Sequence, residues 1–231
     1  MPKHIGIVGC SAEGAALCYR TICMEAPEML GEHRHPEITM HTYPLSDYMD
    51  AIYVDDWEKV GELMVSSARI LAGAGAEFAI SPDNTIHQAF EYVESRSPIP
   101  WLHIARVVAE EAKHRGFSRL GILGTRYLME GPVYSQILAE YQIDPVIPHE
   151  DSRIKINGII FKELVNAIFT DSSRAYFHDE ITRLREHGCD AVVLGCTEIP
   201  LIVEPEESAL PTLDSTRLLA KAAFRKSVET I

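Results

Sequence analysis

Short apolar runs alternate along the chain with longer segments in which apolar residues recur every three or four positions. The short runs are typical of buried strands, and the longer segments are typical of amphipathic helices. The predicted strands are 5–8, 78–80, 120–123 and 191–194, and the predicted helices are 55–71, 103–114, 163–169, 175–185 and 214–228. Strands that alternate with helices predict an α/β fold on a mostly parallel sheet.

The sequence also repeats itself. Residues 4–10 (HIGIVGC) match 119–125 (RLGILGT), and residues 75–85 match 188–198 at nearly the same offset. Together these matches predict two pseudo-symmetric lobes, each with a central, mostly parallel sheet flanked by helices. We expect one lobe to hold 1–100 and 210–231 and the other to hold 101–209, with Pro98 and Pro100 at the crossing.

Ligands of open α/β sheets bind at the carboxyl ends of the strands. Two facing lobes are therefore expected to share one active site between them. The residues that follow the repeated strands are Gly9, Cys10, Asp83, Asn84, Thr85, Gly124, Thr125, Cys196 and Thr197.

Composition and charge narrow the class of protein. The net charge of −13 argues against a nucleic-acid partner, which needs a basic surface. No apolar run reaches the roughly 18 residues that a membrane span requires, so no membrane partner is expected. The five cysteines show no disulfide framework, which predicts free thiols in a reduced, cytoplasmic protein.

The glycines of the first turn do not form a nucleotide loop. Gly6, Gly9 and Gly14 lack the dinucleotide-binding spacing, and Ala15-Ala16 stand where a phosphate loop carries Lys and Ser or Thr. We therefore expect neither NAD nor ATP. The free backbone N–H groups of such a turn nevertheless suit a small carboxylate.

No metal is expected either. His33, His35 and His41 are close in sequence but lack the spacing of known zinc motifs. They are interpreted as solvated loop histidines.

Cys196 is the sharpest candidate for chemistry. It follows a predicted buried strand at a helix start, where the helix dipole and free N–H groups stabilise a thiolate. The alternative is a buried structural cysteine, which is our interpretation of Cys18, Cys23 and Cys189. Asp83 occupies the repeat position equivalent to Cys196. It is either a turn cap or a carboxylate that opposes the thiol across the cleft.

Several motifs together resemble the aspartate/glutamate racemase family, over essentially the whole chain. They are Gly195-Cys196-Thr197-Glu198, Asp83-Asn84-Thr85 ahead of His87, and the segments 124–130, 155–161 and 169–176. The resemblance implies racemisation of an acidic amino acid, aspartate, glutamate or a close analogue, without pyridoxal phosphate or another cofactor. It also implies a small-molecule substrate and a homodimer.

The resemblance assigns roles to individual residues. Family members use one cysteine from each lobe, on opposite faces of the substrate, and Cys196 matches the second of these. Asp83 takes the place of the first. The residues expected to bind the substrate are Asn84, Thr85, Thr125, Lys155, Thr197, Cys10 and Ser11.

The chain departs from the family in three places. Asp83 replaces a cysteine, the loop at 9–11 is shorter by one residue, and 36–58 contain no Arg or Lys for a distal carboxylate. Ordinary pKa values of about 3.9 for Asp and about 8.5 for Cys suit Asp83 as base and Cys196 as acid, but not the reverse. The sequence therefore predicts an asymmetric or weak racemase. The alternatives are a one-thiol decarboxylase or cis–trans isomerase of a small dicarboxylate, and a non-catalytic ligand-binding homologue.

Overall fold

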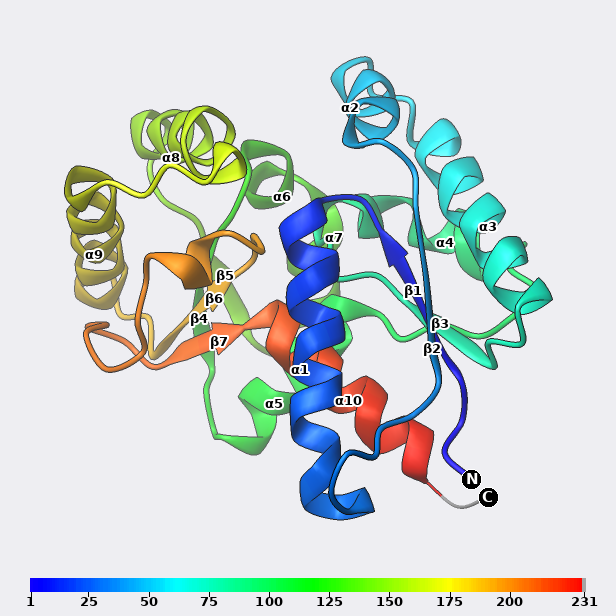
Figure 1. Ribbon diagram of the computed structural model, residues 1–231. Coiled ribbons are helices and arrows are strands. Elements are labelled where there is room, and N and C mark those ends of the chain that lie inside the picture. The colour runs from blue at the N-terminus through cyan, green and yellow to red at the C-terminus, as the bar shows by residue number, and fades with distance from the viewer. Residues whose placement is uncertain (230–231) are drawn as a thin grey trace. The chain divides into compact units, whose positions relative to one another are not determined.

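A computed structural model describes residues 1–229, which divide into two compact units. Unit 1 comprises Met1–Ile104 and the C-terminal residues from Thr216 onward, and unit 2 comprises Ala105–Ser215. Each unit holds its own sheet of parallel strands with helices around it (Figure 1). The α/β fold class with two similar lobes is thus confirmed.

In unit 1 the strand order is β2-β1-β3, and both pairings are parallel. The central strand β1 (Ile5–Gly9) is buried throughout, as expected for a parallel strand covered on both faces. It pairs with β2 (Ile38–Thr42) and β3 (Phe78–Ile80), and its last residue, Gly9, lies opposite Thr42. The helices are α1 (Ala12–Leu30), α2 (Leu45–Tyr53), α3 (Trp57–Gly73), the 3-10 helix η1 (Thr85–Ala89), α4 (Phe90–Glu94) and α10 (Ser215–Val228).

In unit 2 the strand order is β5-β4-β6-β7, again parallel. The strands are β4 (Arg119–Leu123), β5 (Asp144–Val146), β6 (Ala191–Leu194) and β7 (Thr212–Asp214). The helices are α5 (Ile104–His114), α6 (Arg126–Glu130), α7 (Pro132–Glu140), α8 (Glu150–Lys162), η2 (Leu164–Asn166), α9 (Asp171–Glu186) and η3 (Ile199–Leu201). None of the helices in residues 1–229 combines the length and the apolar character needed to cross a membrane.

The internal repeat of the sequence is also a repeat of structure. The order β2-β1-β3 in unit 1 corresponds to β5-β4-β6 in unit 2. An acidic residue just before the third strand bonds the backbone at the first strand in both units: Glu77 accepts from His4 N at 3.0 Å, and Asp190 accepts from Arg119 N at 3.1 Å. The two third strands therefore end at equivalent edges of their sheets.

Equivalent turns lead into those third strands. Gly75 and Gly188 have φ of +98° and +84°, a backbone conformation that glycine adopts without a steric penalty. After the third strand of unit 1, Trp101 forms an isolated parallel bridge to Ala79. This bridge has the position that β7 takes in unit 2.

One predicted helix is wrong. Residues 163–169 were expected to be helical, but α8 already ends at Lys162. A single 3-10 turn follows, and Ala167 adopts a left-handed φ of 56°, which stops any helix from continuing. The next helix starts at Asp171, where Thr170 accepts a hydrogen bond from Ser173 N at 3.1 Å as its N-cap.

Candidate active site

Five of the predicted site residues lie at the carboxyl edge of the unit 1 sheet. Cys10 and Ser11 follow β1, and residues 83–85 follow β3. The structure joins these two connections through Asp83, because Oδ2 accepts a hydrogen bond from Cys10 N at 3.0 Å and Oδ1 accepts one from Ser11 N at 3.1 Å. The carboxylate thus clamps the turn that begins α1.

Asp83 therefore fills the position that we expected a ligand carboxylate to take. The amide groups of Cys10 and Ser11 suit an anion, and the anion bound there is a side chain of the protein itself. Asp83 thus caps this neighbouring turn, while Asn84 stands at the N-cap of η1. Two backbone donors favour the ionised carboxylate.

Tyr48 is a residue of this edge that sequence reasoning missed. It lies on the buried face of α2, is fully buried, and its hydroxyl makes no hydrogen bond of normal geometry within residues 1–229. Burial, together with the negative charges that Cys10 and Asp83 can carry, raises the pKa of Tyr48 above its ordinary value. The phenol therefore stays protonated beside the two candidate residues.

His87, on η1 behind the Asp83 turn, is a neutral core histidine. Its Nε2 bonds Ser81 O at 3.1 Å, its ring stacks on Phe90 with 5.5 Å between the ring centroids, and Nδ1 has no hydrogen-bond partner in the described part of the chain. Burial lowers the pKa of His87 to about 4. His87 therefore adds no positive charge to the edge of the sheet at neutral pH.

We expect this histidine to make stability fall in mild acid. Between pH 6.5 and about 4 the unfolded chain binds a proton at His87 and the folded chain does not. The contribution of neutral His87 to the free energy of unfolding is therefore fully present above pH 6.5. It declines by on the order of 3 kcal/mol as the pH falls through this window. Urea unfolding from pH 4 to 7 should show this slope in the wild type and in His33→Gln, whose histidine is exposed, and a reduced slope in His87→Gln. Equal slopes in all three proteins would contradict the assignment.

In unit 2, Cys196 follows β6 at the equivalent edge and is half-buried. Its thiol donates a hydrogen bond to Glu198 Oε2 at 2.9 Å, and Glu198 is itself 3% exposed. An anionic acceptor beside the sulfur favours the thiol over the thiolate. The candidate acid Cys196 thus lies next to a buried carboxylate. The sequence motif alone did not show that Glu198 is the hydrogen-bond partner of this thiol.

Two glycines allow the strand ends of unit 2 to approach closely. Gly195 N donates to Leu123 O at 2.7 Å, and a Cβ at Gly195 would lie 2.9 Å from that oxygen. A Cβ at Gly124 would lie 3.2 Å from Gly195 O and 2.7 Å from the Leu128 side chain. Larger residues at either position would separate Thr125 from Cys196.

The other predicted residues of unit 2 occupy different settings. Thr197 is 4% exposed, beside Cys196. Thr125 is the N-cap of α6 and accepts a hydrogen bond from Leu128 N at 3.2 Å. Lys155 is exposed on α8, with Nζ 3.8 Å from the centroid of the Tyr176 ring. Lys155 thus keeps a solvent-accessible positive charge.

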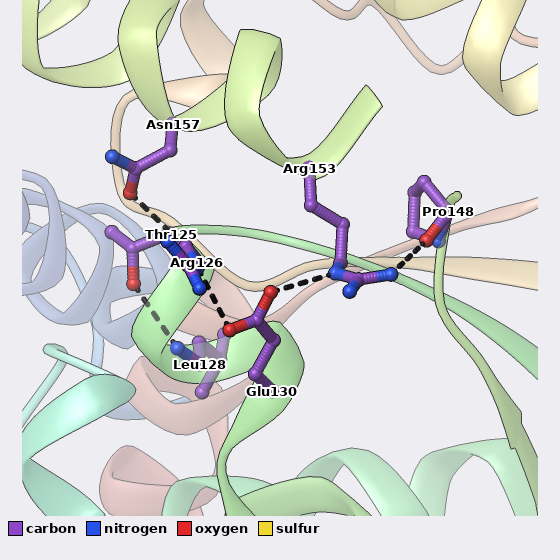
Figure 2. A network of polar contacts seen from close by, with 7 residues as sticks. All are labelled: Thr125, Arg126, Leu128, Glu130, Pro148, Arg153 and Asn157. Atoms are coloured by element: carbon purple, nitrogen blue, oxygen red, sulfur yellow. Dashed lines mark hydrogen bonds and ion pairs between the residues drawn. The ribbon is translucent and has the colours of Figure 1, made fainter. Parts of the chain in front are cut away.

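A polar network fixes α6 against α8 (Figure 2). Arg126 N donates to Asn157 Oδ1 at 2.9 Å, and Glu130 accepts from Arg126 Nε at 2.8 Å and from Arg153 Nε at 2.9 Å. Burial alone would favour the protonated acid, but the bonds from both arginines lower the pKa of Glu130. The network therefore holds Thr125, at the start of α6, in register with the α8 turn that carries Lys155.

Removing this carboxylate should weaken substrate binding and lower stability by similar amounts. Glu130→Gln breaks two partly exposed ion pairs, so we expect a loss of about 1 kcal/mol in unfolding free energy. The pKa of Glu130 is lowered, so this contribution is present above the ordinary glutamate pKa and disappears as the pH falls through the lowered value. We expect KM to rise severalfold with a smaller change in kcat. Glu140→Gln, which breaks the ion pair to Arg106, is the matched control and should leave KM unchanged; an equal rise in KM would argue against the positioning role.

The histidines and remaining cysteines have mostly structural settings. His33 and His35 are exposed, as expected, but His41 lies in β2 rather than in a loop and bonds Ser67 Oγ at 3.0 Å. Within residues 1–229, no three His, Cys, Asp or Glu side chains gather as metal ligands would. The further cysteines are free thiols: Cys10, Cys18 and Cys189 are buried and Cys23 is half-buried.

The chain is similar to known proteins over almost its entire length. The sequence profile described as Asp/Glu/Hydantoin racemase matches residues 5–223. The broad-specificity amino-acid racemase RacX of Bacillus subtilis (strain 168) is 23% identical over 190 residues, covering 81% of this chain and 80% of its own. A candidate Asp/Glu racemase of Yersinia pestis is 30% identical with a TM-score of 0.90, covering 98% of this chain and 100% of its own. An aspartate racemase homologue of Pyrococcus horikoshii OT3 is 26% identical with a TM-score of 0.85, covering 99% and 100%.

Proposed function

Because the chain belongs to the Asp/Glu/hydantoin racemase family, we propose that it is a cofactor-independent amino-acid racemase with Asp83 and Cys196 as its acid/base pair. Membership of a racemase family supports the proposal that this protein is an isomerase. The RacX relative is described as a broad-specificity amino-acid racemase. Aspartate and glutamate are the substrates that the family resemblance predicts. The homodimer that it also predicts stays a prediction.

The proposed reaction moves one proton across Cα. An Asp83 carboxylate oxygen removes the Cα proton on one face, and the electron pair left behind delocalises into the substrate carboxylate. Cys196 then delivers its thiol proton to the opposite face, which leaves protonated Asp83 and a Cys196 thiolate. Lys155 is the proposed counter-ion of the substrate carboxylate. The proposed hydrogen-bonding residues are Asn84, Thr85, Thr125, Thr197, Cys10 and Ser11.

One observation carries the proposal. Asp83 and Cys196 each follow the third strand of their unit, at equivalent edges of equivalent sheets. A two-base racemase needs one proton-transfer group on each face of the substrate. Two groups that the repeat supplies from separate units meet that need if both units contact one substrate.

The hydrogen bonds of the two groups predict an asymmetric enzyme. Backbone donors favour ionised Asp83, and Glu198 favours protonated Cys196, so the resting pair suits one direction. The equilibrium constant of a racemisation is one, which makes kcat/KM equal for the two enantiomers. The asymmetry should therefore appear as unequal kcat values with compensating KM values.

A second function is favoured by the same hydrogen bonds. If the Asp83 carboxylate serves only to clamp the first turn, Cys196 is the sole proton donor. A one-thiol site suits decarboxylation or cis–trans isomerisation of a small dicarboxylate. A non-catalytic binding protein would retain the pocket with neither activity.

Proton exchange at Cα separates these functions. We would incubate each enantiomer of alanine, aspartate, glutamate, asparagine and glutamine in D₂O and follow Cα deuteration by NMR and inversion by chiral chromatography. Deuteration with inversion, unaffected by EDTA and extensive dialysis, is the expected result. Deuteration without inversion would show a working base on one face only. No exchange with any amino acid would reject the racemase and direct the search to dicarboxylates.

A further inference from the structure

The ammonium group of Lys155 rests on an aromatic ring and not on a carboxylate. Its Nζ lies 3.8 Å from the centroid of the Tyr176 ring, and no carboxylate of residues 1–229 lies within ion-pair distance of it. Lys59 and Lys221 each pair with a carboxylate instead, at 3.0 and 2.9 Å. The face of a ring attracts a cation without neutralising its charge. Lys155 therefore keeps a positive charge open to an added anion, in a chain whose net charge is −13.

The packing of unit 2 fixes the ring of Tyr176. This residue lies on α9, is half-buried, and packs against the hydrophobic core cluster that includes Ile156 and Ile181. Burial raises the pKa of its hydroxyl, and the neighbouring Glu180 carboxylate acts in the same direction. The ring is thus a neutral, packed surface beneath the Lys155 charge.

The carboxylate of Glu180 does not compete for Lys155, because other groups occupy it. Glu180 is 2% exposed, Ser152 Oγ donates to its Oε1 at 2.8 Å, and Arg183 forms an ion pair with the same oxygen. Arg183 thereby compensates the buried charge. The bond from Ser152 also ties α8, which carries Lys155, to α9, which carries Tyr176. The two helices are therefore joined at the point where the cation meets the ring.

We propose that Tyr176 is a positioning residue whose ring holds the Lys155 ammonium ready for the substrate carboxylate. This inference rests on the proposed racemase function, in which Lys155 is the counter-ion. A lysine side chain is long and flexible, and ordering it when a substrate binds costs conformational entropy. A ring that orders the side chain beforehand lowers this cost. Because the cost arises at binding, loss of the ring should appear chiefly in KM.

Two substitutions at Tyr176 separate the ring from its hydroxyl. Tyr176→Phe keeps the aromatic face and should keep the wild-type KM for racemisation. Tyr176→Leu removes the face and should raise KM by about two- to fivefold, which is the effect of one exposed cation–π contact, with a smaller change in kcat. Tyr92→Leu is the matched control, because Tyr92 is also half-buried and Arg96 Cζ lies 3.9 Å from the centroid of its ring. This control should keep the wild-type KM.

A measurement that needs no turnover tests the contact itself. In NMR spectra of protein labelled with ¹³C-lysine, the ring current should shift the ε-methylene protons of Lys155 upfield in the wild type and in Tyr176→Phe. The shift should be absent in Tyr176→Leu. Loss of the signal in Lys155→Met assigns it.

The outcomes distinguish this inference from the function on which it rests. An ordinary chemical shift of Lys155 in the wild type, or an unchanged KM in Tyr176→Leu, would overturn the positioning role and leave the racemase intact. A raised KM in Tyr176→Phe equal to that in Tyr176→Leu would also overturn it, because the ring would then not be the cause. If no amino acid exchanges its Cα proton in the wild type, the racemase fails and this inference fails with it. The wild-type spectrum and Tyr176→Phe decide the case even if Tyr176→Leu does not fold.

Discussion

Replacing Cys196 by Ala should reduce racemisation at least about a thousandfold, a barrier increase of about 4 kcal/mol. The change removes the sulfur that is proposed to deliver the proton, and Glu198, its hydrogen-bond partner, loses a donor but gains room for water. Cys196 is only half-buried, so the small cavity should cost little stability. Chiral chromatography from both enantiomers measures the rate, and thermal unfolding measures the fold.

Cys189→Ala is the matched control for this experiment. Cys189 lies just before β6 and Cys196 just after it, so the two thiols stand at opposite ends of one strand. Cys189 is packed in the core of unit 2, and burial raises the pKa of its thiol. We expect this variant to lose about 1 kcal/mol of stability and to keep its rate. A Cys196→Ala protein that retains more than about a tenth of the wild-type rate, a loss below roughly 1.4 kcal/mol, would remove Cys196 from the acid/base role.

The fold could be predicted largely where strands are fully buried. The apolar runs of β1, β4 and β6 are central strands of parallel sheets, and such strands have a continuous hydrophobic pattern. β3 ends its sheet but is also buried at all three residues. The missed strands are three other edge strands. The edge strand β2 (ITMHT) is only partly buried, β5 contains Pro145, and β7 has three residues. Their pairing is decided by tertiary contact rather than by local pattern.

The helices show the same limit. The apolar periodicity of 57–71 belongs to α3, whose buried residues include Val60, Met64 and Leu71. The predicted helix at 163–169 has suitable residue types but is stopped by the left-handed Ala167. No local signal for that backbone conformation exists in a sequence of Ala between Asn and Ile.

For the site, the repeat located Asp83 and Cys196, but not what they bond. The strand ends can be read from two matched segments of sequence. The clamp of Asp83 on Cys10 N and Ser11 N joins residues more than 70 positions apart, and it depends on the parallel pairing of β1 with β3. Contacts of this kind follow from the folded backbone and not from the spacing of residues along the chain.

The clamp changes what a substitution at Asp83 should do. A simple turn cap at this position would accept Asn with little effect on stability. In the structure, each carboxylate oxygen accepts one backbone N–H, and the amide nitrogen of Asn cannot replace one of these acceptors. We therefore expect Asp83→Asn to lose about 1–2 kcal/mol of stability whether or not Asp83 is catalytic. Only the rate distinguishes the two roles: a working base predicts loss of Cα exchange, and a clamp alone predicts a folded variant with near wild-type exchange.

Asp83→Cys should have the opposite effect on the rate. It restores a pair of thiols, whose protonation states exchange with a smaller pKa mismatch than those of an aspartate and a thiol. It also releases the backbone N–H groups of Cys10 and Ser11 from the carboxylate and removes a negative charge. The rate of racemisation should therefore increase most for acidic substrates. We expect lower stability, a higher kcat in the slower direction, and faster racemisation of aspartate and glutamate. Measuring both directions for the wild type, the Asn variant and the Cys variant decides the matter. A fully active Asn variant with no gain for Cys would mean that Asp83 is a structural clamp and that the second base lies elsewhere, with the neighbouring Cys10 thiol the next to test.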